Sequence, residues 1–158
     1  MKTTGIIDIG SNSVRARVFA DGKIVYNGLY TTRLGEGLAT GNRLTAESER
    51  RTIDAVDLLV KAMRSAGAED VYAFATEAVR CAENGREFAA ECEKYTGLLI
   101  DVVDGDEEGE LALLGAVDGG TGGVIDIGGA SAEISVVKEK KIIYSHSLPL
   151  GAVRQYGM

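Results

Sequence analysis

The most constraining feature of this sequence is a short segment that occurs twice. Residues 5–10 read Gly-Ile-Ile-Asp-Ile-Gly, and residues 123–128 read Gly-Val-Ile-Asp-Ile-Gly, so the two segments align without a gap. The correspondence continues beyond them, because Ser13 aligns with Ser131. Each segment predicts a buried strand that ends in a tight turn of small and polar residues. The chain is therefore expected to contain two similar units, each with one Asp-x-Gly loop.

The turn after each strand has the properties of a phosphate-binding loop. Small residues leave backbone N–H groups accessible, and neighbouring hydroxyl groups add further hydrogen-bond donors. The candidate phosphate-binding residues are Gly10, Ser11, Asn12 and Ser13 in the first turn, and Gly128, Gly129 and Ser131 in the second. Asp8 and Asp126 end the two strands and cannot bind an anion, so they are candidate ligands of a metal ion. The alternative is that these residues only form and cap turns.

Composition and charge narrow the range of partners. The chain has 158 residues, 45% of them hydrophobic, and a net charge of −7. A chain of this size can bury one substantial core, and an acidic protein lacks the positive field that attracts nucleic acid or an anionic membrane. The sequence has neither a run of membrane-spanning length nor a signal-peptide pattern at its start. We therefore expect a cytoplasmic protein with no nucleic-acid or membrane partner.

After the first loop, the hydrophobic pattern predicts two more strands and then a long helix. Residues 14–19 alternate apolar and charged side chains, and residues 23–30 form the next strand after a hairpin turn. Residues 31–38 contain two glycines and are not assigned to regular structure. Thr45 is the expected N-cap of the long helix, and Gly67 lies where its C-terminal glycine is expected.

The rest of the first unit alternates strands and helices. Residues 71–75 predict a fully buried strand, and a short helix follows it. Asn84 is expected to open the next helix, with Glu87 completing a capping box. Residues 98–103 predict another strand, which leads into a helix that begins near Gly105. The expected apolar side of this last helix is formed by Leu111, Leu114 and Val117.

A glycine-rich segment separates the two units. Residues 119–123 contain four glycines in five positions and are the predicted hinge. We expect a first domain at residues 1–118 and an incomplete second unit, a β-meander, at residues 124–158. The order βββαβαβα in the first domain predicts an α/β fold with a mixed sheet.

Four further motifs follow in a fixed order between the two loops. They are Arg33-Leu34-Gly35-Glu36-Gly37-Leu38, Thr76-Glu77-Ala78-Val79-Arg80, Asn84-Gly85-x-x-Phe88 and Gly105-Asp106-Glu107-Glu108. Together with the two loops, they resemble the exopolyphosphatase/guanosine pentaphosphate phosphohydrolase family, within the actin–Hsp70–sugar-kinase superfamily. The resemblance implies a ribonuclease H-like/actin-like ATPase fold with a truncated second unit. It also implies Mg²⁺-dependent hydrolysis of terminal phosphoanhydride bonds in polyphosphate or guanosine pentaphosphate.

The resemblance assigns roles to two charged residues between the loops. Glu108 corresponds to the carboxylate that orients or activates water, and Arg80 to an arginine that contacts phosphate. The residues alone leave other interpretations open. Glu108 lies with Asp106 and Glu107 in the first turn of a helix, where the helix dipole favours carboxylates. Arg80 could equally be a surface residue of a helix, paired with a carboxylate.

The sequence departs from the family pattern in two residues and in length. Ala130 stands where the family usually has a third glycine, and Ala132 where it usually has threonine, so the second loop has one hydroxyl fewer. Family members also continue with the helices of a second domain. Without those helices, the second meander is expected to expose an apolar face. That face includes Val124, Ile134, Val136 and Ile143. We therefore expect a homodimer in which two meanders cover each other.

Three functions remain open. The first is a small metal-dependent phosphatase of this family. The second is a non-catalytic phosphate- or nucleotide-binding module that serves as a partner subunit. The third, a kinase-type phosphotransferase, is less favoured because the sequence has no recognisable adenosine-binding segment. His146, the only histidine, falls in an alternating strand and is assigned no catalytic role.

Overall fold

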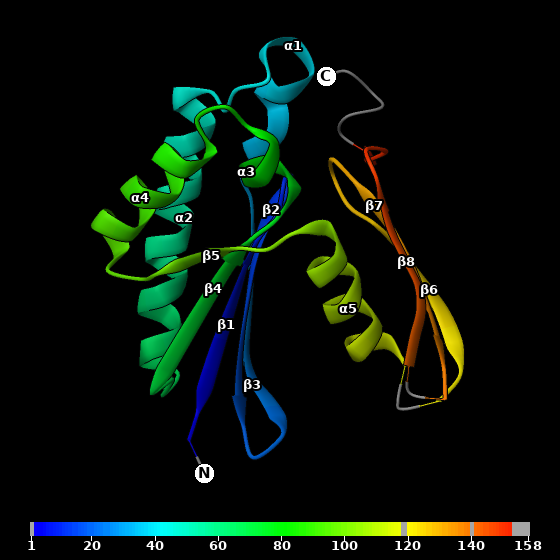
Figure 1. The fold of residues 1–158 in the computed structure, drawn as a ribbon. Coiled ribbons are helices and arrows are strands. Elements are labelled where there is room, and N and C mark those ends of the chain that lie inside the picture. Colours follow the sequence, from blue (N-terminus) through cyan, green and yellow to red (C-terminus); the bar gives the residue numbers. More distant parts are fainter. Residues whose placement is uncertain (1, 118–119, 140, 153–158) are drawn as a thin grey trace.

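The larger part of the molecule is a five-stranded mixed sheet (Figure 1). The computed structural model describes residues 2–117, 120–139 and 141–152. The strands are β1 (Thr4–Ile9), β2 (Ser13–Ala20), β3 (Lys23–Thr31), β4 (Asp70–Ala75) and β5 (Ile100–Val102). They lie in the order β3-β2-β1-β4-β5, with β1, β2 and β3 antiparallel and β4 and β5 parallel to β1. This arrangement confirms the predicted mixed sheet.

Helices α2 (Ala46–Ser65) and α4 (Gly85–Thr96) cover one face of this sheet (Figure 1). The core between these layers is aliphatic and includes Ile7, Ile9, Val14, Val18, Val56, Leu59, Met63 and Phe88. Thr45 caps α2 as predicted, because its hydroxyl accepts a hydrogen bond from the amide of Ser48. The segment without a sequence assignment forms η1 (Leu34–Gly37) and α1 (Leu38–Gly41), and α3 (Glu77–Cys81) follows β4.

A second, smaller sheet follows the glycine-rich segment. It is antiparallel and consists of β6 (Gly122–Ile127), β7 (Ala132–Lys138) and β8 (Lys141–Leu148). Helix α5 (Gly105–Ala116) lies between the two sheets and packs on the smaller one (Figure 1). A Cβ atom on Gly109 would lie only 2.7 Å from the hydroxyl oxygen of Ser135, so the glycine permits this close approach. One face of the second meander is thus covered by a helix, and the prediction that no helix covers it was wrong.

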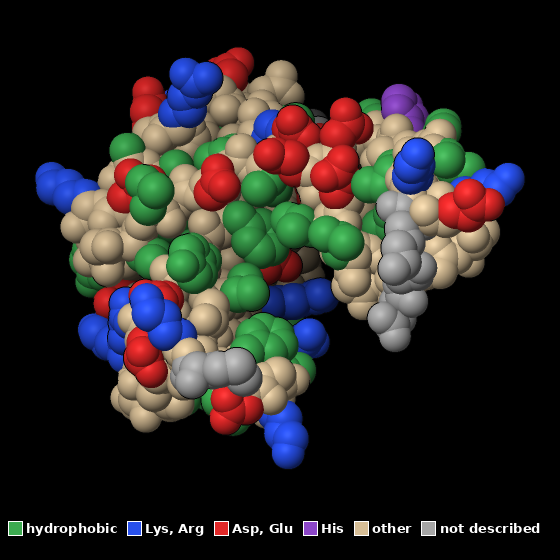
Figure 2. Space-filling model, turned by 60° about the horizontal axis from the view of Figure 1, so that its bottom comes forward, with side chains coloured by type: hydrophobic (Ala, Val, Ile, Leu, Met, Phe, Trp, Pro, Cys, Tyr) green, Lys and Arg blue, Asp and Glu red, His purple; other side chains and the backbone are tan. Residues whose placement is uncertain are grey.

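The other face of the five-stranded sheet is open. A groove of about 600 Å³ separates it from α5, and the side chains of Tyr72, Leu99 and Leu111 in this groove are 61, 78 and 47% exposed. Figure 2 shows hydrophobic side chains gathered in the middle of one face of the molecule, next to a group of acidic ones. The prediction that residues 71–75 form a fully buried strand was therefore wrong, because helices cover only one side of β4.

Two helix predictions also fail. The expected apolar side of α5 is largely exposed, with Leu114 77% accessible, whereas Leu113 is buried. The reason is that α5 packs through its glycines on the serines of the second sheet. Asn84 forms no capping box; its side chain bonds instead to the backbone N–H and C=O of Leu44. It thereby ties the start of α4 to the start of α2.

The predicted hinge is only partly described by the structure. Residue 119 lies outside the described residues, and Gly122 and Gly123 belong to strand β6. The division into domains at residues 118 and 124 remains a prediction. No helix within the described ranges is both long and apolar enough to cross a membrane.

Candidate active site

The two Asp-x-Gly loops meet at one cavity of about 230 Å³. All the site residues predicted from the sequence line it, except Arg80. These lining residues are Asp8, Gly10, Ser11, Asn12, Ser13, Glu108, Asp126, Gly128, Gly129 and Ser131. Arg15, Thr76, Ile127 and Ala152 complete the wall. Residues more than 110 positions apart in the sequence are thus brought together between the two sheets.

The two loops have the same backbone turn. The amide of Gly10 donates to the carbonyl of Ser13 at 3.1 Å, and the amide of Gly128 donates to the carbonyl of Ser131 at 2.9 Å. The loops also touch, because a Cβ atom on Gly129 would lie 3.2 Å from the backbone nitrogen of Asn12. Two turns rich in N–H groups therefore face the same small volume, which suits an anion.

Glu108 enters this volume from the first turns of α5. Its side chain is only 19% exposed. The pKa of Glu108 is raised from 4.5 to about 7, mainly by burial and also by the carboxylate of Glu133, while Arg80 opposes the shift. A carboxylate with a pKa near 7 can take a proton from water at neutral pH, as a general base must. By contrast, Glu107 accepts a hydrogen bond from the amide of Asp104 and completes the cap of α5.

Arg80 lies behind Glu108 and is outside the cavity lining. Its guanidinium bonds to a carboxylate oxygen of Glu77 at 2.6 Å and to the carbonyl of Val103 at 2.7 Å. It also contacts the Oε2 atom of Glu108 at 3.4 Å. Arg80 on α3 thus contacts the side chain of Glu108 on α5 and helps to fix its position. The phosphate contact of Arg80 that the resemblance implies remains a prediction.

Asp8 and Asp126 lie close enough for their charges to interact. The pKa of Asp8 is raised from 3.8 to about 6, mainly by burial; Arg15 opposes the rise and the charge of Asp126 adds to it. Within the described part of the chain, no three His, Cys, Asp or Glu side chains converge as a metal cage. Two neighbouring carboxylates nevertheless fit Mg²⁺, which usually takes one or two protein carboxylates together with waters and substrate phosphates.

Sequence reasoning missed two charged residues at the site. Arg15 lies directly across from Asp8 in the pairing of β1 with β2, and Glu133 lies across from Asp126 in the pairing of β6 with β7. Glu133 is 2% exposed and accepts a hydrogen bond from the hydroxyl of Ser147 at 2.8 Å. The available signal was the repeat itself, because the alignment of the two units pairs Arg15 with Glu133.

Comparison with known proteins gives the same result as the motifs. The sequence model of the Ppx/GppA phosphatase family matches residues 15–156. The chain is 32% identical over 160 residues to exopolyphosphatase 1 of Mycobacterium tuberculosis, covering 95% of this chain and 46% of that protein. It is 30% identical to the guanosine-5'-triphosphate,3'-diphosphate pyrophosphatase of Pseudoalteromonas translucida, covering 94% of this chain and 31% of that protein.

The fold comparison agrees. The solved Ppx/GppA family member of Aquifex aeolicus superimposes with a TM-score of 0.81 at 33% identity, covering 96% of this chain and 52% of that chain. The predicted actin-like ATPase fold is thereby confirmed. The chain spans about half the length of that structure and less than half of the two curated relatives. Because the family model covers nearly all of the sequence, this chain belongs to the Ppx/GppA phosphatase family.

Proposed function

We propose that this chain hydrolyses the terminal phosphoanhydride bond of polyphosphate or of guanosine pentaphosphate. The observation that carries the proposal is the position of Glu108, a largely buried carboxylate with a pKa near 7 in the wall of a cavity between two phosphate-type loops. The names of the relatives, an exopolyphosphatase and a guanosine-5'-triphosphate,3'-diphosphate pyrophosphatase, supply the two substrate classes.

In this proposal, the terminal phosphate lies between the loops and accepts hydrogen bonds from their N–H and hydroxyl groups. Glu108 orients a water molecule in line with the scissile bond and takes one of its protons. The water oxygen bonds to phosphorus while the bond from phosphorus to the bridging oxygen breaks. Inorganic phosphate and a chain shorter by one phosphate are released. Arg80 keeps the Glu108 side chain directed at the water through its contact from behind.

Asp8 and Asp126 are the residues that would hold Mg²⁺. The ion would neutralise charge on the phosphate oxygens as the anhydride bond breaks. Burial raises the pKa of Asp8, and a cation bound beside it would favour the ionised form that a metal ligand needs. The pair leaves room for substrate oxygens and waters as the remaining ligands.

We also propose that a second copy of the chain covers the outer face of the second sheet. Ile125 and Ile127 on β6 and Tyr144 on β8 share this face by register and are 68, 68 and 50% exposed. Strands β6 and β8 are the edge strands of this sheet. Exposed apolar side chains next to unpaired strand edges favour self-association. Light scattering at micromolar concentration should report a dimer, and Ile125→Lys should reduce it to a monomer. A monomeric wild-type chain would contradict the proposal.

The activity is tested by phosphate release from polyphosphate and from guanosine pentaphosphate with Mg²⁺. Glu108→Gln should lower the rate about 10²–10⁴-fold, the range expected when a general base is lost. Glu110→Gln is the matched control, because Glu110 is an exposed carboxylate on the same helix. An unchanged rate in Glu108→Gln would refute the assignment. If neither the wild type nor Glu108→Gln releases phosphate, but both bind phosphate chains, the chain is a non-catalytic binding subunit.

A further inference from the structure

The first phosphate loop is held in place by a neighbouring segment, residues 32–37. The carbonyl of Asn12 accepts hydrogen bonds from the amides of Thr32 and Arg33, at 3.0 and 2.9 Å. The carbonyl of Ser11 accepts one from the amide of Gly35 at 2.8 Å. The carbonyls of Ser11 and Asn12 therefore point toward residues 32–37, none of which lines the cavity.

This arrangement determines where the loop directs its donors. In a trans peptide, the C=O of one residue and the N–H of the next point in opposite directions. The peptide groups that follow Ser11 and Asn12 are trans. Because their carbonyls are bound on one side, the N–H groups of Asn12 and Ser13 point to the other side, which is the cavity that both residues line. The backbone nitrogen of Asn12 accordingly lies next to Gly129 of the second loop.

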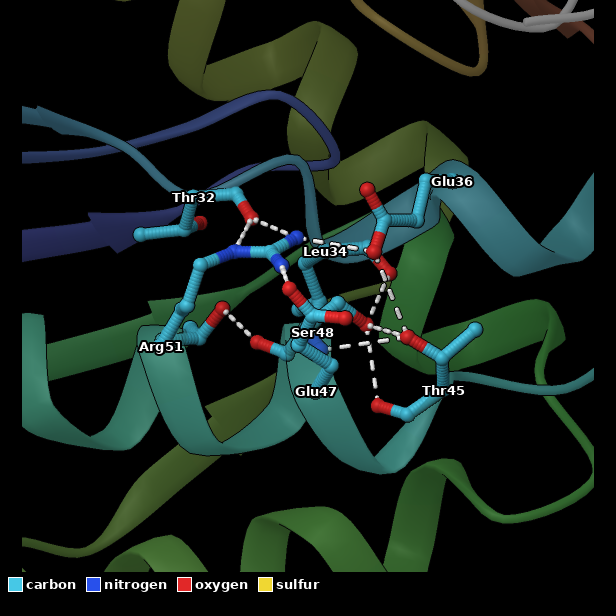
Figure 3. Close-up of polar contacts among 8 residues, drawn as sticks. Thr32, Leu34, Glu36, Thr45, Glu47, Ser48 and Arg51 are labelled. Atoms are coloured by element: carbon cyan, nitrogen blue, oxygen red, sulfur yellow. Dashed lines mark hydrogen bonds and ion pairs between the residues drawn. The ribbon is translucent and has the colours of Figure 1, made fainter.

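Residues 32–37 are themselves fixed by two side chains of α2, of which Arg51 makes more contacts. The guanidinium of Arg51 donates from Nε and Nη2 to the carbonyl of Thr32, at 3.1 and 3.0 Å (Figure 3). Its Nη2 atom also contacts the carboxylate of Glu36 at 2.8 Å. Ser48, one turn earlier on α2, donates to the carbonyl of Leu34 at 3.2 Å. Arg51 thus holds both ends of this short segment at once.

The chemistry of these contacts favours arginine over any other residue. A planar guanidinium can donate two parallel hydrogen bonds to one carbonyl and still reach a carboxylate, whereas lysine has no such fork. Gly35 adds a steric requirement, because a Cβ atom there would lie 3.2 Å from the Cβ atom of Ser11. The segment therefore has one close-fitting position against the first loop.

We propose that Arg51 is a positioning residue of the phosphate site. It fixes residues 32–37, whose amides hold the carbonyls of the first loop, so that the N–H groups of Asn12 and Ser13 face the phosphate. The inference rests on the proposed function only in that the ligand of this cavity is a phosphate group. The orientation of the loop can be tested without a ligand.

The test compares Arg51→Gln and Arg51→Lys with the control Arg50→Gln in the same chain. Arg50 is the neighbouring residue on α2 and pairs only with Asp54 and the ring of Tyr95 among the described residues, so its loss removes the same charge. Thr32→Val is a second control. Its hydroxyl has no hydrogen-bond partner among the described residues, and the substitution keeps the backbone carbonyl that Arg51 binds.

Two measurements are made, the amide NMR signals of both loops and the dissociation constant of inorganic phosphate with Mg²⁺. In Arg51→Gln, the Asn12 and Ser13 amides should shift and exchange faster with solvent, while the Gly128 and Ser131 amides stay unchanged. The phosphate dissociation constant should rise about tenfold, the equivalent of about 1.4 kcal/mol. Arg51→Lys should fall between this variant and the wild type, and both controls should match the wild type.

Unchanged Asn12 and Ser13 signals in a folded Arg51→Gln protein would overturn the inference, as would an equal effect in Arg50→Gln. If Arg51→Gln does not fold, Glu36→Gln tests the same connection from the other partner and should shift the same amides. If the wild type binds no phosphate but the amides respond as expected, the proposed function fails and the role of Arg51 in orienting the loop stands.

Discussion

The two β-meanders share a sequence pattern and a loop geometry, but their surroundings differ. In the first, Ile7 and Ile9 are fully buried beneath helices. At the same places in the second, Ile125 and Ile127 are 68% exposed. The face of the second meander that α5 covers carries Ser135, Ser145, Ser147 and Glu133, with Val137 as its buried aliphatic side chain. The first unit therefore has a hydrophobic core of its own, whereas the second contributes to the site with little apolar burial.

The two units also differ in the charge that faces their aspartates. Each unit carries one residue directly across from its aspartate, and this residue is Arg15 in the first unit and Glu133 in the second. Arg15 lowers the pKa of Asp8, while Glu133 raises the pKa of Glu108. Two copies of one backbone thus form an asymmetric site, with a guanidinium on one side and an extra carboxylate beside the proposed general base. The repeat supplies the loops, burial raises the proton affinities of Asp8 and Glu108, and the divergent side chains adjust them in opposite directions.

The largest expected effect comes from a matched pair of core substitutions. Ile7→Ala should lower the free energy of unfolding by about 2–5 kcal/mol, because it leaves a cavity in a packed core. Ile125→Ala, at the equivalent position, should change it by less than about 0.5 kcal/mol in dilute protein. Urea denaturation followed by circular dichroism measures both. Equal losses would show that the outer face of the second meander is buried in solution, and a loss that grows with protein concentration would assign that burial to a second copy.

Much of the first unit was predictable because its signals are local. Alternation identified β2, the capping residue Thr45 identified the start of α2, and the order of elements predicted the mixed sheet. The failures involved packing between elements. The sequence of β4 is apolar, yet Tyr72 is exposed because helices cover only one face of the sheet. The leucines of α5 predicted an apolar stripe, but Gly109 and the serines opposite it set the contact face instead.

The site was predictable to the extent that it repeats. The duplicated segment identified both loops and both aspartates, and the resemblance identified Glu108. The repeat also aligned Glu133 with Arg15, but only the register of β6 with β7 shows that it lies beside Asp126. The structure was needed for Arg51, which acts through residues 32–37 rather than on the cavity, because its importance comes from the packing of α2 on a loop.

A smaller effect is expected on the pH dependence of stability, which differs between the two aspartates. Burial raises the pKa of Asp8 from 3.8 to about 6, so the folded protein holds this proton more tightly than the unfolded chain. The resulting stabilisation is complete below about pH 4 and is lost as the pH rises through 6. Asp8→Asn should therefore gain about 3 kcal/mol of stability relative to wild type between pH 4 and pH 8 without Mg²⁺.

Asp126→Asn is the matched control for this measurement, because the corresponding side chain in the second loop is exposed. Thermal unfolding of the three proteins at pH 4, 6 and 8 gives the comparison. An equal gain in stability in both variants would mean that Asp8 and Asp126 are equally buried. The two units would then not differ in the burial of their aspartates.

The smallest expected effect is that of Gly129→Ala, which tests how closely the two loops must approach each other to bind phosphate. A Cβ atom on Gly129 would lie 3.1 Å from the Cβ atom of Ser11 and 3.2 Å from the nitrogen of Asn12, so Gly129→Ala must move the loops apart by a few tenths of an ångström. The cost of such crowding is about 1 kcal/mol, and the affinity for inorganic phosphate should fall about fivefold. Gly115→Ala on α5 is the control, since a Cβ atom there meets no atom of the described residues within 4 Å. If Gly129→Ala binds phosphate as tightly as this control, the loops do not act together on one anion, and the phosphate is held by the first unit alone.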